Sequence, residues 1–353
     1  ESVIFKGFKY DYGSGGIHGC IKAGVYDSDE DYTIIDIDVA SLYPSIAIVN
    51  KLYPQHLGKE FCDVYENEII KPRLKAKKEG NKVLSDGLKL SANSVYGKSN
   101  DIFSFLMDSA YTARTTINGQ LMLSMLAEDL VLEIEDLTML QINTDGLTVK
   151  ILKTDEDKLH NICKSWENKT NLILEYVTYD KMIIRDVNNY CARTVDGKIK
   201  NKGAFEIDKM VGSERAYHKN NSFRIIPIAL SKYFFEGVSV EDTINNHTDI
   251  YDFCGRQKFV GKDVGELHYI KDGERVVEKQ QKNTRYYLST NGDTFIKHYS
   301  KGSYEKIHVG YKVTVFNKYI KKEIKDYNID YQWYIKECLK EIEHIEDRQL
   351  ELF

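Results

Sequence analysis

Thr33–Ser45, with the sequence TIIDIDVASLYPS, is the stretch around which the rest of the chain can be organised. Its first half is rich in β-branched residues, which predicts a buried strand that delivers Asp38 to an open edge. Ala40–Ser45 then offers backbone N–H groups, serine hydroxyls and a Tyr-Pro turn, which suit a polyanion beside a carboxylate-bound metal. Taken alone, an Asp at a strand end is more often a helix cap or a turn residue, so this interpretation depends on the other motifs.

Length and composition narrow the class of protein. The chain has 353 residues, enough for two or three domains with a sizeable core. Its net charge of -5 means that a nucleic-acid partner has to be argued from local patches. The 6 cysteines show no C-x-x-C pair and no His/Cys ligand spacing, which favours reduced thiols over disulfides or structural zinc. No apolar run approaches the roughly 18 residues that span a membrane. We therefore expect a cytoplasmic protein.

A basic segment follows, Lys71–Lys82, with the sequence KPRLKAKKEGNK. Arg73 and Lys77 are four residues apart, as are Lys89 and Asn93, so each pair lies on one helical face. Two antiparallel helices with inward cations would clamp a triphosphate, because Lys and Arg neutralise the charge that grows on a leaving pyrophosphate. The alternative is a solvated helix face.

Two further segments have clear periodicity. Ser99–Ile134 predicts a helix whose apolar stripe contains Leu121, Met125, Leu126 and Leu130. Leu137–Ile151 alternates around Asn143-Thr144-Asp145-Gly146, which predicts a β-hairpin. An isolated sequence of this kind is ordinarily only a turn.

Three of these motifs together resemble a known family. Asp38–Ser45 (DVASLYPS) resembles motif A of the family B DNA polymerases, and Lys89–Gly97 (KLSANSVYG) resembles motif B. Asn143–Gly146 (NTDG) stands where motif C is expected. The motifs occur in the family order, and the resemblance covers nearly the whole chain, strongly at the motifs and weakly beyond Gly203.

The resemblance implies an α+β right-hand polymerase fold with an antiparallel-sheet palm, helical fingers and an α+β thumb. The palm would comprise residues 1–50 and 98–185, the fingers 51–97 and the thumb 186–348. Family members usually carry a proofreading exonuclease domain before motif A, and little chain precedes Asp38 here. We therefore expect a fragment, a processed product or a polymerase without that domain.

The resemblance also implies the chemistry, namely addition of deoxynucleotides from dNTPs to a primer 3′-hydroxyl with two Mg²⁺ ions, for which Mn²⁺ can substitute. Asp38, Asp145 and the Val39 carbonyl would hold the ions, and Lys89 would stabilise or protonate the leaving pyrophosphate. The positions that match nucleotide-binding residues are Ser41, Leu42, Tyr43, Arg73, Lys77, Lys89, Asn93 and Tyr96.

Contacts with primer and template are implied for a second set of residues. They are Tyr12, Gly15, Gly16, Gly97, Thr144, Tyr190, Lys202 and Arg285. The sequence departs from the family at Asn143, where Asp is usual, and at Asn188-Asn189, where Lys is usual; amides there would reduce the salt dependence of DNA binding. Asp36 is expected to be a buried, hydrogen-bonded carboxylate.

The C-terminus has its own motif after a predicted helix over Tyr331–Ile345. Gln349–Phe353 (QLELF) resembles the pentapeptide by which bacterial DNA polymerases dock on the ring-shaped sliding clamp. Gln349, Leu350, Leu352 and Phe353 would make that contact. The alternative is a helix end that folds back on the core.

The sequence thus predicts a DNA-directed DNA polymerase, a nucleotidyltransferase of phage genome replication that acts as a monomer in the bacterial host cytoplasm. Its partners would be primer–template DNA, dNTP and a sliding clamp. Two other classes stay open. A catalytically silent, polymerase-like DNA-binding protein fits the changes at Asn143 and Asn188-Asn189. A metal-dependent nuclease would use paired carboxylates, but it would not need the cation–Asn–Tyr face of Lys89–Gly97.

Overall fold

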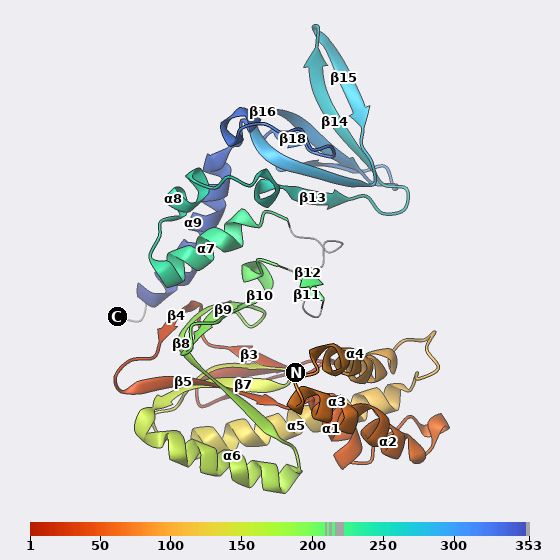
Figure 1. Cartoon of the computed structure of the whole chain (residues 1–353), viewed down its shortest axis with the longest axis vertical. Coiled ribbons are helices and arrows are strands. Elements are labelled where there is room, and N and C mark those ends of the chain that lie inside the picture. Colours follow the sequence, from red (N-terminus) through yellow and green to blue (C-terminus); the bar gives the residue numbers. More distant parts are fainter. Residues whose placement is uncertain (209, 212–213, 216–221, 351–353) are drawn as a thin grey trace. The chain divides into compact units, whose positions relative to one another are not determined.

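The computed structural model describes residues 1–208, 210–211, 214–215 and 222–350 (Figure 1). The fold is of the mixed α+β class, and its strands pair in antiparallel register. The chain divides into two compact units, of which the first is built mainly from Glu1–Lys200 and the second from Asn201–Asp347. Each unit has its own sheet.

The sheet of the first unit is organised around β5, the predicted buried strand. The strand order is β1-β2-β3-β6-β7-β5-β8-β9-β10, and β4 also pairs with β8. The strands are β1 (Ser2–Phe5), β2 (Phe8–Tyr12), β3 (Ile17–Cys20), β4 (Gly24–Asp27), β5 (Tyr32–Val39), β6 (Thr138–Asn143), β7 (Gly146–Leu152), β8 (Leu174–Asp186), β9 (Asn189–Thr194) and β10 (Ile199–Lys202). β6 and β7 form the predicted hairpin, and they bring motif C directly beside motif A.

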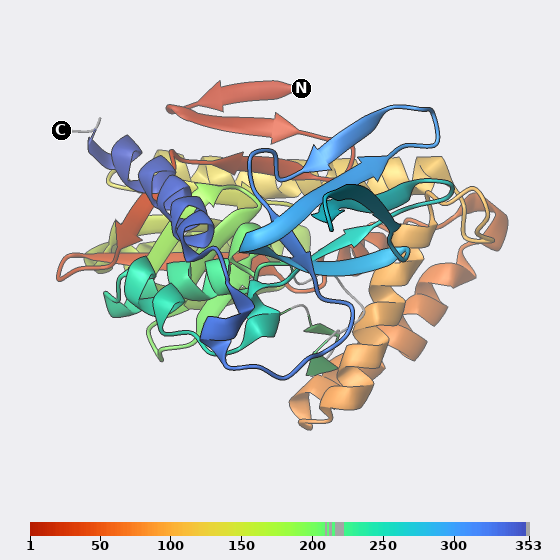
Figure 2. The ribbon, with the colours of Figure 1, turned by 90° about the horizontal axis from the view of Figure 1, so that it is seen from above.

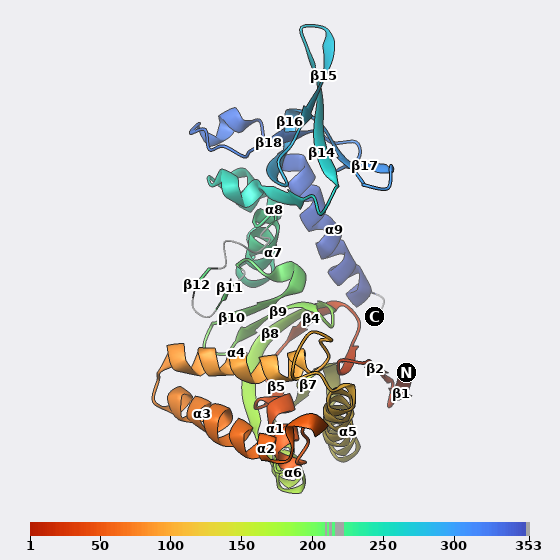
Figure 3. The same cartoon turned by 90° about the vertical axis from the view of Figure 1, so that its right-hand side faces the viewer.

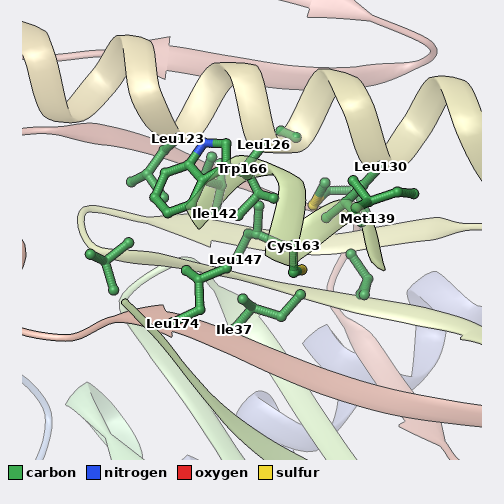
Figure 4. Close-up of a cluster of buried hydrophobic side chains, with 14 of the residues drawn as sticks. Ile37, Leu123, Leu126, Leu130, Met139, Ile142, Leu147, Cys163, Trp166 and Leu174 are labelled. Carbon is green, nitrogen blue, oxygen red and sulfur yellow. The ribbon is translucent and has the colours of Figure 1, made fainter. Parts of the chain in front are cut away.

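Two long helices, α5 (Ser109–Glu133) and α6 (Glu156–Thr170), cover one face of this sheet (Figure 1). Figure 4 shows side chains of α5 packed with Ile142, Leu147 and Trp166 in a buried hydrophobic cluster. The predicted helix over 99–134 begins later than expected, because Asp108 caps it by accepting a hydrogen bond from the Tyr111 N–H at 2.9 Å.

The apolar stripe predicted for this helix was only half right. Leu126 and Leu130 are buried, together with Leu123, whereas Leu121 is 58% and Met125 40% exposed. Apolar residues occur on both sides of α5, so the sequence periodicity did not identify the face that meets the sheet.

The segment 51–97, predicted as helical fingers, is mostly helical. It contains α2 (Glu60–Val64), a π-helical stretch η2 (Tyr65–Ile70), α3 (Lys71–Lys78) and nearly all of α4 (Lys82–Lys98), and it follows α1 (Leu42–Val49). Figure 3 shows α3 and α4 side by side, joined by a short turn. Asn81 caps α4 by accepting from the Leu84 N–H. The expected two-helix hairpin is present.

The second unit combines helices with a smaller antiparallel sheet (Figure 2). It contains α7 (Ile225–Glu236), α8 (Val240–Asn245), β13 (Gly255–Lys258), β14 (Val264–Lys271), β15 (Glu274–Lys279), β16 (Asn283–His298), β17 (Tyr304–Ile307), β18 (Val313–Val315) and α9 (Tyr331–Leu350), with the short strands β11 (Met210–Val211) and β12 (Glu214–Arg215). The long strand β16 pairs with β13, β14, β17 and β18. Tyr334 of α9 is fully buried, and its hydroxyl donates to the Phe253 carbonyl at 2.7 Å.

The boundary between the units falls within β10, later in the chain than the predicted start of a separate domain at residue 186. The reason is that β9 pairs along β8 and so extends the first sheet. Within the described residues, no helix combines the length and the apolar character needed to cross a bilayer. Leu352 and Phe353 lie outside the described residues, as do the side chains of Gln349 and Leu350 at the end of α9.

Candidate active site

Strand β5 places two carboxylates on one face of the sheet. Ile35 and Ile37 point into the core beneath α5 and α6, so the alternate residues Asp36 and Asp38 point to the opposite face. Asp36 is buried, whereas the Asp38 side chain is 43% exposed. Asp38 therefore lies near the carboxyl end of β5 with a partly exposed side chain, although β5 is an interior strand flanked by β7 and β8.

The β6–β7 turn brings the second carboxylate next to Asp38. Asp38 lies opposite Gly146 in the β5–β7 ladder, and the Val39 N–H donates to the Asp145 carbonyl at 2.7 Å. A Cβ atom at Gly146 would overlap the Asp38 carboxylate and would come within 2.6 Å of the Ile37 carbonyl oxygen. Glycine at this position therefore allows the two acidic segments to approach each other so closely.

A cavity of about 400 Å³ opens at this point. Its wall combines acids of the sheet with basic, amide and aromatic side chains of the helical hairpin. The lining residues are Asp38, Val39, Ser41, Leu42, Tyr43, Pro44, Arg73, Lys89, Asn93, Tyr96, Thr144, Asp145 and Glu175. Three sequence motifs that are far apart in the chain thus meet around one hollow.

Several carboxylates lie close together on the acidic side of the cavity, and they affect the pKa of Asp38. Burial, and then the charge of Asp36, raise the pKa of the Asp38 carboxyl to about 7. Asp145 and Glu175 push this pKa further upward, and Lys200 opposes them. A cation bound among these carboxylates would relieve the repulsion.

Asp36 belongs to a buried polar cluster behind Asp38. It accepts hydrogen bonds from Thr148 at 2.6 Å and from the Tyr179 hydroxyl at 2.7 Å. Lys200 Nζ lies 3.0 Å from Asp36 and 4.0 Å from Asp38. Burial alone would lower the pKa of Lys200, but the charge of Asp36 raises it above its ordinary value. The expected buried, hydrogen-bonded role of Asp36 is confirmed.

The start of α1 forms another wall of the cavity. The Ala40 N–H donates to the Ile173 carbonyl, and the Ser45 N–H donates to the Ser41 carbonyl. Fewer N–H groups of Ala40–Ser45 are therefore available to an anion than the sequence suggested. Ser41 has φ 54°, and its hydroxyl accepts a hydrogen bond from the Arg73 guanidinium.

Arg73 also carries an unused donor. Among the described residues, its buried Nε atom has no hydrogen-bond partner. A buried guanidinium donor without a partner is unfavourable, and an anionic oxygen would satisfy it. This side of the cavity is therefore suited to an anion.

Helix α4 contributes the face predicted from its spacing. Lys89, Asn93 and Tyr96 all line the cavity. Across the described chain, no carboxylate forms an ion pair with Lys89, so its ammonium is available. Lys77 was predicted to join this set, but it does not line the cavity; its Nζ lies 2.5 Å from Glu175.

An aromatic pair forms the floor of the cavity between the helices. The rings of Tyr43 and Tyr96 stack with centroids 3.9 Å apart. The Tyr43 hydroxyl donates to the Gly15 carbonyl, and the Tyr96 hydroxyl lies 2.6 Å from Thr116 Oγ1. Burial, and then Tyr96, raise the pKa of Tyr43, so it stays a neutral donor.

Asn143, which stands where the resembled family usually has Asp, makes its hydrogen bond outside the cavity. Asn143 donates to the Val187 carbonyl at 2.9 Å, and it does not line the cavity. Thr144 lines the cavity in a left-handed conformation with φ 62°, and its hydroxyl lies 3.1 Å from His18 Nε2. A Cβ atom at Gly16 would meet Thr144 at 3.3 Å, so the glycine loop packs against this turn.

Several predicted contact residues are not brought to the cavity. Tyr12 lines a different pocket, and its hydroxyl lies 2.9 Å from Ser124 Oγ. Tyr190 is only 5% exposed and packs in the core, so its ring is not a surface for DNA. Gly97 does not line the cavity. Lys202 and Arg285 belong to the second unit.

The structure adds two charged groups that the sequence did not single out. Glu175 lies opposite Asp38 in the β5–β8 ladder and lines the cavity. Lys200 of β10 lies close to the carboxylates of Asp36 and Asp38. Both come from strands distant in sequence, and only strand pairing brings them to Asp38; no local spacing marks either residue.

Comparison with known proteins does not supply a family. No protein-family model matches the sequence, and no curated protein matches it significantly. The function therefore rests on the geometry of the site and on its motifs.

The carboxylates of the cavity are suitable ligands for a hard divalent cation. Asp38 and Asp145, with Glu175 near them, offer only oxygen ligands, and hard Mg²⁺ prefers oxygen. Carboxylates on one wall, with Arg73 and Lys89 on the other, would suit a metal-bound polyphosphate.

Proposed function

We propose that this chain is the catalytic core of a family B DNA polymerase with right-hand architecture. In this proposal the first sheet is the palm, the α3–α4 hairpin belongs to the fingers, and the second unit belongs to the thumb. One observation carries it: Asp38 and Asp145 share a cavity with Lys89, Asn93 and Tyr96. A nuclease would use the acids, but it would have no need of the α4 face.

The residues of the chain would have distinct roles in nucleotide addition. Asp38 and Asp145, with the Val39 carbonyl, would hold Mg²⁺. The bound metal supplies activation of the primer 3′-hydroxyl and neutralisation of the triphosphate. Lys89 and Arg73 would bind the phosphates on the opposite wall, where they stabilise charge on the departing pyrophosphate.

The remaining lining residues would shape the space for the nucleotide. Tyr43 would pack beneath the deoxyribose, and Asn93 and Tyr96 would border the nascent base pair. Base selection would come from pairing with the template, so the protein needs to test only shape. Priming would use an ordinary nucleic-acid 3′-end. Protein-primed members of the family carry an insertion between motifs A and B, and the 50 residues between Asp38 and Lys89 are largely taken up by α1, α2, η2 and α3 and by the start of α4.

Primer extension tests the proposal directly. The full chain, a labelled primer–template, dNTPs and Mg²⁺ should give template-dependent extension, and omission of one dNTP should stop the products at the expected base. Strand shortening with Mg²⁺ would establish a nuclease instead. Tight primer–template binding without turnover would establish a silent DNA-binding protein.

A further inference from the structure

A second group of metal-binding side chains lies in the sheet of the second unit, on β14 and β16. Glu266 and His268 are two residues apart on β14, and His298 on β16 lies opposite Val264. Antiparallel partners and alternate residues of one strand share a face, so all three side chains emerge on the same side. Gly265 and Leu267 are buried on the other side.

The spacing of the three donor atoms is close to that of a metal site. Glu266 Oε2 lies 3.0 Å from His268 Nε2 and 2.9 Å from His298 Nε2. No two of the three donor atoms are more than 4.8 Å apart. Ligands bonded to tetrahedral zinc at about 2.0–2.2 Å are themselves about 3.3 Å apart. A modest rotation of one imidazole would therefore complete the geometry.

One nitrogen of the group is not satisfied by hydrogen bonding. Within the described part of the chain, the buried His298 Nε2 atom makes no aligned hydrogen bond, although Glu266 lies so near.

We propose that Glu266, His268 and His298 form a site for a divalent transition metal, Zn²⁺ foremost, that joins β14 to β16. Two imidazoles and one carboxylate match the preference of Zn²⁺ for nitrogen and oxygen, and they are a poor set for Mg²⁺. The side chains are 14% exposed for His268, 27% for Glu266 and 39% for His298, so water can reach the fourth position.

Two positively charged residues of β15, Arg275 and Lys279, lie near the three ligands and should weaken the binding of a cation. Arg275 Nη2 lies 2.9 Å from His268 Nδ1. A guanidinium can only donate, so the neutral imidazole carries its proton on Nε2, where the metal would bind. Metal binding must move that proton to Nδ1 and displace Arg275, which is exposed. Lys279 lies opposite Glu266 and would act through its charge alone.

Cobalt titration of the full chain tests the site, because tetrahedral Co²⁺ with nitrogen ligands absorbs visible light. Millimolar Mg²⁺ in the buffer keeps Co²⁺ from the oxygen-rich cavity of the first unit. We expect one equivalent of Co²⁺ to bind with visible absorption and to be displaced by Zn²⁺. His268→Ala and His298→Ala should each abolish the absorption, whereas His344→Ala, an exposed histidine outside the group, should leave it unchanged.

The cation variants separate a metal site from a hydrogen-bonded cluster. Arg275→Ala should tighten Co²⁺ binding several-fold, because it removes a positive charge and a hydrogen bond that metal binding has to displace. Lys279→Ala should tighten it less, because it does not touch a ligand. Circular dichroism checks that each variant is folded. No visible absorption in the unmodified chain, absorption that survives both histidine variants, or weaker binding by Arg275→Ala would overturn the proposal.

Discussion

The rings of Tyr43 and Tyr96 stack with an interplanar angle of 17° and centroids 3.9 Å apart, although one lies in motif A and the other in motif B. The pair joins the first turn of α1 to the last turn of α4. Offset stacking of aromatic rings contributes about 0.5–1.5 kcal/mol beyond the burial of area. The pair therefore helps to hold the start of α1 against the end of α4 beside the cavity.

The first prediction concerns this pair and the sugar of the nucleotide. Tyr43→Ala should remove the surface beneath the sugar, so the ratio of ribonucleotide to deoxyribonucleotide incorporation should rise. Tyr43→Phe is the matched control, since it keeps the ring and loses only the hydrogen bond to Gly15. Single-nucleotide incorporation measures the ratio. If Tyr43→Ala leaves it unchanged, Tyr43 is only part of the core.

The second prediction assigns the metal ligands. Asp38→Asn and Asp145→Asn should each abolish nucleotide incorporation while primer–template binding persists, because each removes a negative ligand from a preformed site. Asn143→Ala should be far milder, since this amide is turned to the Val187 carbonyl. Incorporation by either Asp variant at the original rate would refute the assignment. Equal loss in Asn143→Ala would make Asn143 a ligand.

The third prediction follows from the raised pKa of Asp38. An unfolded Asp titrates near pH 4, whereas the folded pKa is about 7. Between about pH 4 and about pH 7 the folded state holds a proton that the unfolded chain has lost, so the metal-free protein should lose stability as the pH rises. The stability of Asp38→Asn should fall less over this pH range, because the variant has no carboxyl group at this position.

Thermal unfolding in EDTA at several pH values measures this effect. At about pH 8, Mg²⁺ should raise the midpoint of the unmodified chain more than that of Asp38→Asn, because binding to the folded state stabilises it. If the unfolding midpoints of the two proteins change in parallel with pH, the pKa of Asp38 is not raised in the folded state.

The fourth prediction concerns Lys200 and the charge that it compensates. Lys200→Met should lower the free energy of unfolding by roughly 2–3 kcal/mol, because Asp36 would remain buried without its cation. The double variant Asp36→Asn, Lys200→Met should recover much of this loss. Urea unfolding measures both. An additive effect of the two changes would show that the 3.0 Å ion pair contributes little.

The fifth prediction concerns the C-terminal tail. Deletion of Gln349–Phe353 should leave single-nucleotide incorporation unchanged, and it should remove any increase in product length that a bacterial sliding clamp provides. Even a micromolar contact, worth about 8 kcal/mol, would raise the effective concentration of the enzyme at its primer. Long-template extension with and without the clamp tests this. Equal stimulation of the intact and truncated chains would show that the tail does not bind it.

The sequence by itself determined the local features. A run of β-branched residues identified β5, alternation identified the β6–β7 hairpin, and helical spacing placed Lys89, Asn93 and Tyr96 on one face. These features follow from periods of 2 and 3.6 residues, which are visible within a short window. The face of α5 was partly mispredicted, because apolar residues occur on both of its sides.

Only the tertiary structure decided which distant groups share a site. Glu175 and Lys200 reach Asp38 through strand pairing, and Lys77 is turned from the cavity by its ion pair with Glu175. His298 lies beside Glu266 and His268 for the same reason. The sequence has no recognisable metal-ligand spacing, so sequence reasoning missed this group. Pairing register depends on the packing of the whole sheet, and one residue of slip would move every one of these side chains to the opposite face.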